Sequence, residues 1–383
     1  MLNKVAVLQD SIVKGIVVTV GIRMRSWRVI LALLPLFLIF SACGHSSLAV
    51  TAAPTTSPTS WVDQHVSFVA GGIRIYATLR HPTDSSQKVP GVLLIAGSGP
   101  TDRNGNSSLT PGSIDTLKTI ADWLSEDGVA SLRYDKLGSG HTGLGRYASD
   151  PATIGLAPFE QESLAALGFL ARQANINDNR LGVFGHSEGA LFSLLLASGT
   201  DGPTPPVRAL GLIEPLSVRY LDLVKAQVDM QIGEEVQAGY FTSSQASQAR
   251  ATLAAAVTHL RSTGKVPTSL PFGLSNVLSP STALFFYQAD QYDPASLAAK
   301  LLPGTAVFVS CSNADQQVSC AEVNHLVSGL EKAKTSVDFV HLVGVDHVLK
   351  VDPTGSTAGF TKPLPFSPQF KSALAAFVQR KLD

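Results

Sequence analysis

The feature that most constrains the fold is a serine between two glycines, in the sequence Gly185-His-Ser187-Glu-Gly189. The apolar run at residues 180–184 precedes it and the apolar run at residues 190–197 follows it, so we expect a strand before the turn and a helix after it. This is the pattern of a nucleophile elbow. Glycine is needed on both sides because a side chain there would collide with the neighbouring strand or helix backbone. The alternative is a purely structural Gly-Ser-Gly turn.

The composition narrows the class of protein. The chain has 383 residues, of which 45% are apolar, enough for a sizeable core in one large or two medium domains. Charged residues make up 15% and give a formal net charge of zero. The sequence contains no basic stripe of the kind that indicates a nucleic-acid partner. We therefore expect a neutral or weakly charged small-molecule substrate. Neither of the spaced cysteines has a zinc-type partner, and we expect no metal and no cofactor.

The N-terminal residues have the layout of an export signal. A short basic region at residues 24–28 is followed by an apolar run at residues 29–40, which is too short for a comfortable membrane span. Small residues before Cys43 resemble a bacterial lipoprotein box in which that cysteine is lipidated, although Phe40 stands where such boxes prefer leucine. We therefore expect a signal at residues 1–43, with Met24 as the true start. An uncleaved membrane anchor is the alternative.

The expected product is an exported protein, either lipid-anchored in a bacterial cell envelope or secreted. Its only membrane contact would be this N-terminal lipid or signal anchor. Residues 44–60 are rich in Ser, Thr, Ala and Pro, which indicates a flexible tether.

The rest of the chain alternates strand and helix patterns. Strands are expected at residues 61–69, 73–79, 90–96, 129–134, 180–184, 207–213, 305–310 and 337–343. Helices are expected at residues 114–126, 159–173 and 190–197, from near 319, and from 368. This order predicts an α/β fold with a mostly parallel sheet, helices on both faces, and ligands at the carboxyl ends of the strands.

One segment interrupts the alternation. Residues 216–300 contain helical patterns at 220–238, 243–260 and 281–292. We interpret this segment as a helical cap inserted between a first core part, 61–215, and a second core part, 301–383. Phe285, Phe286 and Tyr287 are either pocket aromatics or, more simply, cap core.

A serine nucleophile needs a base and a group that orients the base. His347 follows the last expected strand, where a loop can carry an imidazole to Ser187; the alternative is a surface-loop histidine. Asp315 follows the preceding strand and would hold the imidazole tautomer. Asp346 and Asp293 are rival acids, but the chain order serine, aspartate, histidine favours Asp315.

The developing oxyanion also needs donors. The backbone N–H of Glu188, at the start of the helix after the turn, supplies one. The N–H of Ser98, in the glycine-rich loop at residues 97–105, is the candidate for the second. The alternative for that loop is a plain turn.

From about residue 66 to the C-terminus, the chain resembles serine hydrolases of the α/β-hydrolase superfamily, in its secreted or lipid-anchored esterase and acyl-peptidase-like branch. The resemblance rests on the Gly-x-Ser-x-Gly turn, on Gly-Ser-Gly-Pro-x-Asp-Arg at residues 97–103, and on Arg-Tyr-Asp-Lys-Leu-Gly-Ser-Gly at residues 133–140. The residues Tyr-Asp-Pro at 292–294 resemble the cap exit of such enzymes. Leu137 stands where these enzymes usually have an arginine, so one structural salt bridge of the family is not expected here. Ala96 stands where many of them have a histidine, so one side chain that supports the oxyanion loop is missing, while the amide donors remain.

Two cysteines, Cys311 and Cys320, bracket Asp315. In an exported protein they could form a disulfide that fastens the acid loop to a helix capped by Ser319 and Glu322. Two buried thiols are the alternative.

These observations predict a carboxylic-ester hydrolase that works through an acyl-enzyme. A peptidase, aminoacyl hydrolase or acyltransferase with the same triad is a second hypothesis. In that case Glu234 and Glu235 would recognise a substrate amine, although they could equally form a solvated helix face. The third hypothesis is a non-catalytic envelope binding protein, since fold alone never proves function.

Overall fold

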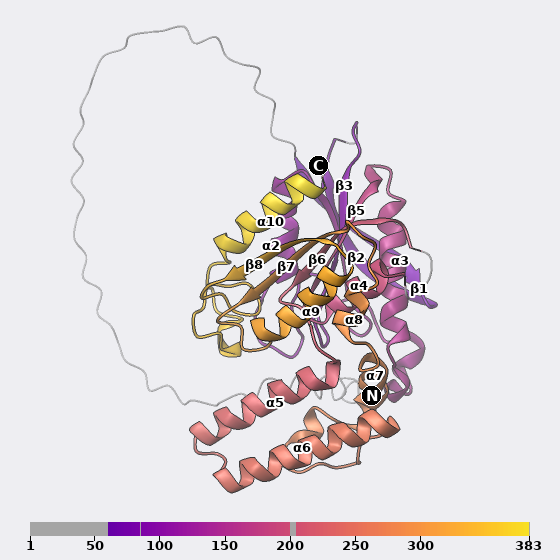
Figure 1. The fold of residues 1–383 in the computed structure, drawn as a ribbon. Coiled ribbons are helices and arrows are strands. Elements are labelled where there is room, and N and C mark those ends of the chain that lie inside the picture. The colour runs from indigo at the N-terminus through magenta and orange to yellow at the C-terminus, as the bar shows by residue number, and fades with distance from the viewer. Residues whose placement is uncertain (1–59, 85, 200–203, 383) are drawn as a thin grey trace, which may run out of the picture.

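The computed structural model describes residues 60–84, 86–199 and 204–382. They contain an eight-stranded sheet in the order β1-β2-β4-β3-β5-β6-β7-β8 (Figure 1). The strands are β1 (Trp61–Ala70), β2 (Ile73–Pro82), β3 (Val89–Ile95), β4 (Ala130–Tyr134), β5 (Ile176–His186), β6 (Val207–Ile213), β7 (Ala306–Ser312) and β8 (Ser336–Leu342). β2 is antiparallel to both β1 and β4, and all other neighbours are parallel. The predicted α/β class with a mostly parallel sheet is confirmed.

Helices cover both faces of this sheet (Figure 1). α2 (Thr116–Glu126) and α10 (Pro368–Lys381) pack on one face, and α3 (Ala157–Ala171), α4 (Gly189–Ala197) and α9 (Cys320–Lys332) pack on the other. β3 is apolar along its length because both of its faces are buried. Leu93 and Ile95 belong to the core on the α4 side, whereas Val92 and Leu94 belong to the core on the α2 side.

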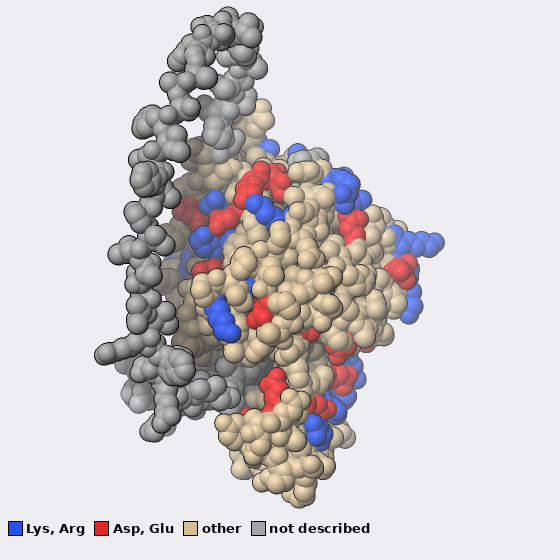
Figure 2. Space-filling view, turned by 90° about the vertical axis from the view of Figure 1, so that its left-hand side faces the viewer, with Lys and Arg blue, Asp and Glu red and all other residues tan. Residues whose placement is uncertain are grey.

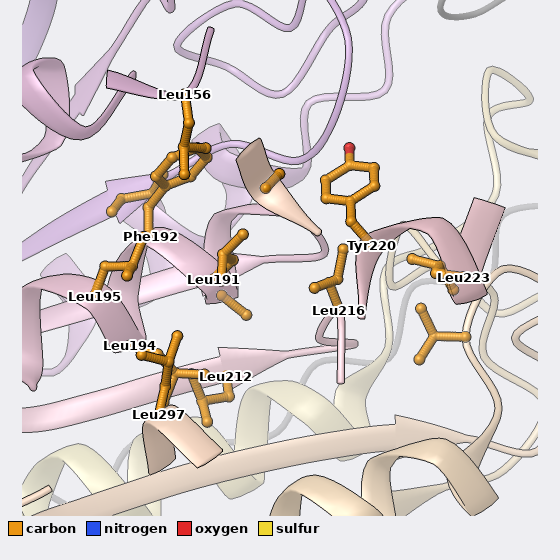
Figure 3. Packing of buried hydrophobic residues seen from close by; sticks show 14 of the residues in the cluster. Leu156, Leu191, Phe192, Leu194, Leu195, Leu212, Leu216, Tyr220, Leu223 and Leu297 are labelled. Atoms are coloured by element: carbon orange, nitrogen blue, oxygen red, sulfur yellow. The ribbon is translucent and has the colours of Figure 1, made fainter. Parts of the chain in front are cut away.

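Between β6 and β7 the chain forms a helical insert. It contains α5 (Tyr220–Gln237), α6 (Ser243–Thr263), η3 (Leu274–Asn276), α7 (Pro280–Ala289) and α8 (Pro294–Ala298), and α5 and α6 extend below the sheet in Figure 1. The short helices η1 (Gly145–Ala148), η2 (Pro151–Thr153) and η4 (Thr357–Gly359) lie in other connections. The apolar core continues into the insert, because Leu216 and Tyr220 lie between the leucines of α4 and Leu223 of α5 (Figure 3).

A buried carboxylate fixes the base of the insert. Asp290, which follows α7, is 0% exposed. It accepts hydrogen bonds from Arg219 (2.7 Å), from Arg261 (2.8 Å) and from the Leu221 amide (2.9 Å). The start of α5 and the end of α6 are therefore held at one point, which sets the position of α5 relative to the sheet.

Some element boundaries differ from those that the sequence predicts. α2 begins at Thr116 rather than 114, because Asp115 has a left-handed backbone (φ 62°) and the Asn106 side chain accepts the amides of Ile114 and Asp115. β5 begins at Ile176 rather than 180, because Ile176 pairs with Val89 of β3. α8 was not predicted. It has only five residues and begins where the Asp293 side chain accepts the Ser296 amide.

The predicted signal, residues 44–59 of the predicted tether, and Cys43 lie outside the described residues. None of the helices in the described part combines the length and the apolar character that crossing a bilayer requires. On the described part of the face shown in Figure 2, Lys and Arg side chains are interspersed with Asp and Glu.

Candidate active site

The turn from β5 into α4 is as tight as the sequence predicts. A Cβ on Gly185 would lie 2.1 Å from the Gly189 carbonyl oxygen, and one on Gly189 would lie 2.3 Å from the carbonyl oxygen of Ile95. Ser187, at the top of the turn, has a left-handed backbone with φ 53°. Its amide donates to the Ile213 carbonyl at 2.9 Å. The serine is thus held at the carboxyl end of β5 by the adjoining strands, β3 and β6.

Ser187 lines two cavities. The first, which we call the His347 cavity, is bordered by His186, Gln317 and His347 together with Ser98 and other polar residues of the glycine-rich loop. The second, the Leu223 cavity, is bordered mainly by apolar residues: Leu216, Tyr220, Leu223, Val224, Val228, Val277 and Phe286. Gln227 of α5 borders both cavities, and its side chain donates to the Gln317 carbonyl at 3.1 Å. The helical insert therefore lies directly against the serine.

His347 and Asp315 form a buried pair. His347 Nδ1 lies 2.7 Å from Asp315 Oδ2, and the two side chains are 9% and 0% exposed. The other Asp315 oxygen accepts the amides of Gln317 (2.6 Å) and Val318 (3.1 Å). Burial opposes ionisation of Asp315, but the charge and hydrogen bond of His347 and hydrogen bonds from Glu214 and Gln317 outweigh it and hold its pKa below the usual value. Because Nδ1 is engaged, Nε2 is the imidazole nitrogen available to Ser187.

The two rival acids are engaged elsewhere. Asp346 Oδ1 accepts the amides of Val348 and Lys350, at 3.1 and 2.7 Å, within its own loop. Its burial raises its pKa to about 6. Asp293 caps α8. The structure thus brings Ser187, His347 and Asp315 together and leaves Asp346 and Asp293 out.

His186 has a role that the sequence did not indicate. Its Nε2 lies 2.8 Å from the His347 carbonyl oxygen, and the two imidazole rings are 4.9 Å apart. Burial, followed by the nearby His347, lowers its pKa to about 3, so the ring is neutral and must donate from Nε2. His186 therefore fastens the His347 loop to the serine turn and does not act as a base.

The predicted oxyanion donors lie beside the serine. Ser98 and Glu188 both border the Leu223 cavity together with Ser187. Within the described ranges, neither backbone amide donates a hydrogen bond to another protein group. Glu188 follows Ser187 directly and precedes the first residue of α4, Gly189, so its amide lies at the positive end of that helix. Both amides are free to bind an anion.

A buried ionic network joins the two donor segments. Lys136 Nζ donates to the Gly97 carbonyl oxygen and, at 3.0 Å, to Glu188 Oε1, while the Tyr220 hydroxyl donates to the other Glu188 oxygen. Lys136 therefore ties the loop that carries Ser98 to the residue after Ser187. Sequence reasoning did not single out Lys136 or Tyr220, although Lys136 lies within the quoted segment 133–140.

The same segment contains a second buried ion pair. Arg103 Nη2 lies 2.6 Å from Asp135 Oδ2, and the Arg103 amide donates to Oδ1 of Asp135 at 2.8 Å. The glycine-rich loop is thus anchored to the residues after β4, although Leu137 stands where an arginine is usual.

The loop that carries Asp315 is closed covalently. A disulfide joins Cys311, in β7, to Cys320, the first residue of α9. Ser319 and Glu322 form a reciprocal capping box at the start of α9. In the part of the chain that the structure describes, no three His, Cys, Asp or Glu side chains are grouped so that they could hold a metal ion.

Comparisons with known proteins agree with this architecture. No family model and no curated protein matches the sequence. Among solved structures, the chain is similar to Est1E from Butyrivibrio proteoclasticus with bound ferulic acid, with 17% identity, a TM-score of 0.51, and coverage of 83% of this chain and 99% of that chain. It is also similar to the Pyrococcus furiosus esterase Pf2001, with 16% identity, a TM-score of 0.52, and coverage of 87% and 96%. The chain therefore has the α/β-hydrolase fold.

We predict that removing the disulfide loosens the acid loop. The double variant Cys311→Ser/Cys320→Ser should lose about 2–3 kcal/mol of unfolding free energy, because a short closed loop is opened in the unfolded chain. Hydrolysis should fall as well, because Asp315 lies inside that loop. Denaturant unfolding and ester hydrolysis measure the two effects. Equal stability and equal activity of the double variant and the parent under oxidising conditions would contradict the prediction.

Proposed function

We propose that this protein is a serine hydrolase that cleaves carboxylic esters through an acyl-enzyme intermediate. The observation that carries the proposal is the sharing of one cavity by Ser187, on its strained turn, and His347, whose Nδ1 is bound to a buried carboxylate. A serine, a neutral imidazole and an orienting aspartate are the groups that acyl transfer requires.

In the proposed reaction, the Ser187 hydroxyl attacks the ester carbonyl carbon while His347 Nε2 takes its proton. Asp315 stabilises the imidazolium through the 2.7 Å contact with Nδ1. The tetrahedral intermediate collapses, the bond between carbon and leaving oxygen breaks, and His347 returns the proton to the alcohol. Water then repeats the sequence on the acyl-enzyme, which releases the acid and restores Ser187.

The Ser98 and Glu188 amides are the proposed oxyanion hole. Each has an N–H without a protein acceptor among the described residues, and Lys136 links their segments. Preorganised donors of this kind contribute about 3 kcal/mol each to lowering the barrier, because they need no rearrangement as charge develops.

Two observations favour an ester over an amide substrate. The similar structures Est1E and Pf2001 include one that is named an esterase and one that holds ferulic acid, a carboxylic acid. Neither Glu234 nor Glu235, the residues predicted to recognise an amine, borders the His347 cavity or the Leu223 cavity. Glu235 instead borders a separate cavity between α5 and Phe272.

The shape of the site supports a substrate with a short apolar group. The Leu223 cavity ends at Tyr220 and Phe286, whose rings are 5.3 Å apart. Beyond these rings lies a second apolar cavity, which we call the Phe159 cavity; it is bordered by Leu144, Ile154, Phe159 and Phe285 as well as by Tyr220 and Phe286. Tyr220 and Phe286 thus form a wall that limits the length of a chain lying next to Ser187.

We also propose that the helical insert is the cap of the site and that the N-terminal signal exports the enzyme. The contacts of α5 with the Ser187 cavities support the first proposal. The second rests on the sequence layout before Cys43.

Replacing the nucleophile tests the proposed chemistry. Ser187→Ala should lower kcat for p-nitrophenyl butyrate by roughly 10⁶-fold, to the residual rate that the oxyanion donors alone support. The unfolding midpoint should be nearly unchanged, because only one hydroxyl is lost. Aminoacyl anilides, assayed in parallel on the parent, separate an esterase from a peptidase. Undiminished ester turnover by Ser187→Ala would refute the proposal.

Removing the wall should change chain-length preference. Phe286→Ala joins the Leu223 and Phe159 cavities, so kcat/KM for longer p-nitrophenyl esters should rise relative to the acetate. Each additional buried methylene is worth about 0.8 kcal/mol, or roughly fourfold. Phe241→Ala is the matched control, because Phe241 borders the cavity of Glu235 and neither the Leu223 cavity nor the Phe159 cavity. An unchanged chain-length profile in a folded Phe286→Ala variant would contradict this account of the wall.

A further inference from the structure

A buried carboxyl group behind the proposed triad takes no part in the proposed reaction. Glu214 follows β6 directly, is 0% exposed, and has a left-handed backbone with φ 42°. β6 lies between β5, which leads to Ser187, and β7, which leads to Asp315. The position of Glu214 at the carboxyl end of β6 therefore places it between the serine turn and the acid loop.

The contacts of Glu214 define its protonation state. Its Oε1 accepts from the Ser310 hydroxyl and its Oε2 from the Ser312 amide, both at 3.1 Å. Its carboxyl group also lies within hydrogen-bonding reach of the buried Asp315 carboxyl group. Two ionised carboxylates cannot form a hydrogen bond with each other, since neither has a proton to donate.

The proton belongs on Glu214. Asp315 has His347 and two backbone amides to stabilise its negative charge, whereas Glu214 has one hydroxyl and one amide. Burial, followed by the charge of Asp315, raises the pKa of Glu214 well above its usual value. The shared proton is therefore held by the carboxyl group that is farther from the imidazole in the hydrogen-bonded chain.

We propose that Glu214 is a positioning residue that stays protonated and donates a hydrogen bond to Asp315, so that Asp315 keeps its orientation toward His347. This inference rests on the proposed function. The bond restricts rotation of the Asp315 carboxylate and withdraws electron density from it. Asp315 then attracts the imidazolium less strongly than a free carboxylate would.

Other titratable groups face the same site. His186 approaches from the end of β5, and Asp346 lies next to His347 in the loop after β8. Burial keeps His186 neutral with a pKa of about 3. Asp346, with a pKa of about 6, ionises within the pH range over which activity is measured. Because both are present in every variant compared, a shift between variants reports on Glu214.

Two replacements of Glu214 separate the effect of its hydrogen-bond donor from the effect of its side-chain volume. Glu214→Gln keeps a donor for Asp315, and Glu214→Met has a similar volume but no donor. We expect kcat for p-nitrophenyl butyrate to fall about 10- to 100-fold in Glu214→Met, with KM within about threefold, because one hydrogen bond to a charged group is lost. The acid limb of its kcat/KM profile should move to higher pH, because Asp315 without its hydrogen-bond donor stabilises the positively charged imidazolium more strongly. Glu214→Gln should retain most of kcat and the parent acid limb.

Parent-like kcat and acid limb in a folded Glu214→Met variant would overturn the proposal. Equal losses in both variants would overturn it too, because a donor would then not rescue activity.

Infrared spectroscopy tests whether the Glu214 carboxyl group is protonated, and it does not depend on enzyme activity. Infrared difference spectra between the parent and Glu214→Gln at pH 7 should contain a carboxylic-acid band from the parent. Glu162→Gln calibrates the method, because burial raises the pKa of Glu162 to about 8 and it should also be protonated at pH 7. Absence of the Glu214 band, with the Glu162 band present, would overturn the proposal even if Glu214→Met does not fold. A band from an inactive parent would instead count against the proposed function alone.

Discussion

The structure depends on the close approach of three backbone segments at the turn from β5 into α4. Gly185 contacts Gly189 across the turn, and Gly189 lies against the carbonyl of Ile95 in β3, at separations that leave no room for a Cβ. Ser187 takes the left-handed conformation that results, at a cost on the order of 1–3 kcal/mol. Packing of α4 against the sheet offsets this cost, because all the side chains of residues 190–196 are buried. The position of the serine is therefore a property of the whole sheet.

Each loop that approaches the serine is fixed by a different kind of interaction. A buried histidine, His186, binds the backbone of the His347 loop, and a disulfide closes the loop of Asp315. Lys136 joins the glycine-rich loop to Glu188. These connections preorganise the site, since donors and acceptors that are already in place need no rearrangement during the reaction. The helical insert adds the apolar surface and, through Gln227, a direct link to the acid loop.

The sequence predicted what depends on periodicity and on local turn chemistry. Apolar runs and, for β1 and β2, an alternating hairpin pattern located every strand of the sheet, and glycine spacing located Ser187. The positions of His347 and Asp315 after the last two strands were enough to bring them to the same edge. The sequence could not reveal Glu214, Lys136 or Tyr220 as parts of the site, because their hydrogen bonds join segments that are far apart in the chain and leave no local pattern. The left-handed Asp115 was missed because its conformation depends on a hydrogen bond to the Asn106 side chain, which no periodic pattern indicates.

The central claim is that Ser187 is activated by His347. Mass spectrometry of the intact protein after reaction with a fluorophosphonate, followed by peptide mapping, tests it most directly. We expect one adduct per chain, located on Ser187, and a strongly reduced labelling rate in a folded His347→Ala variant. Failure of the folded parent to react, or equally fast labelling of Ser187 without His347, would contradict it.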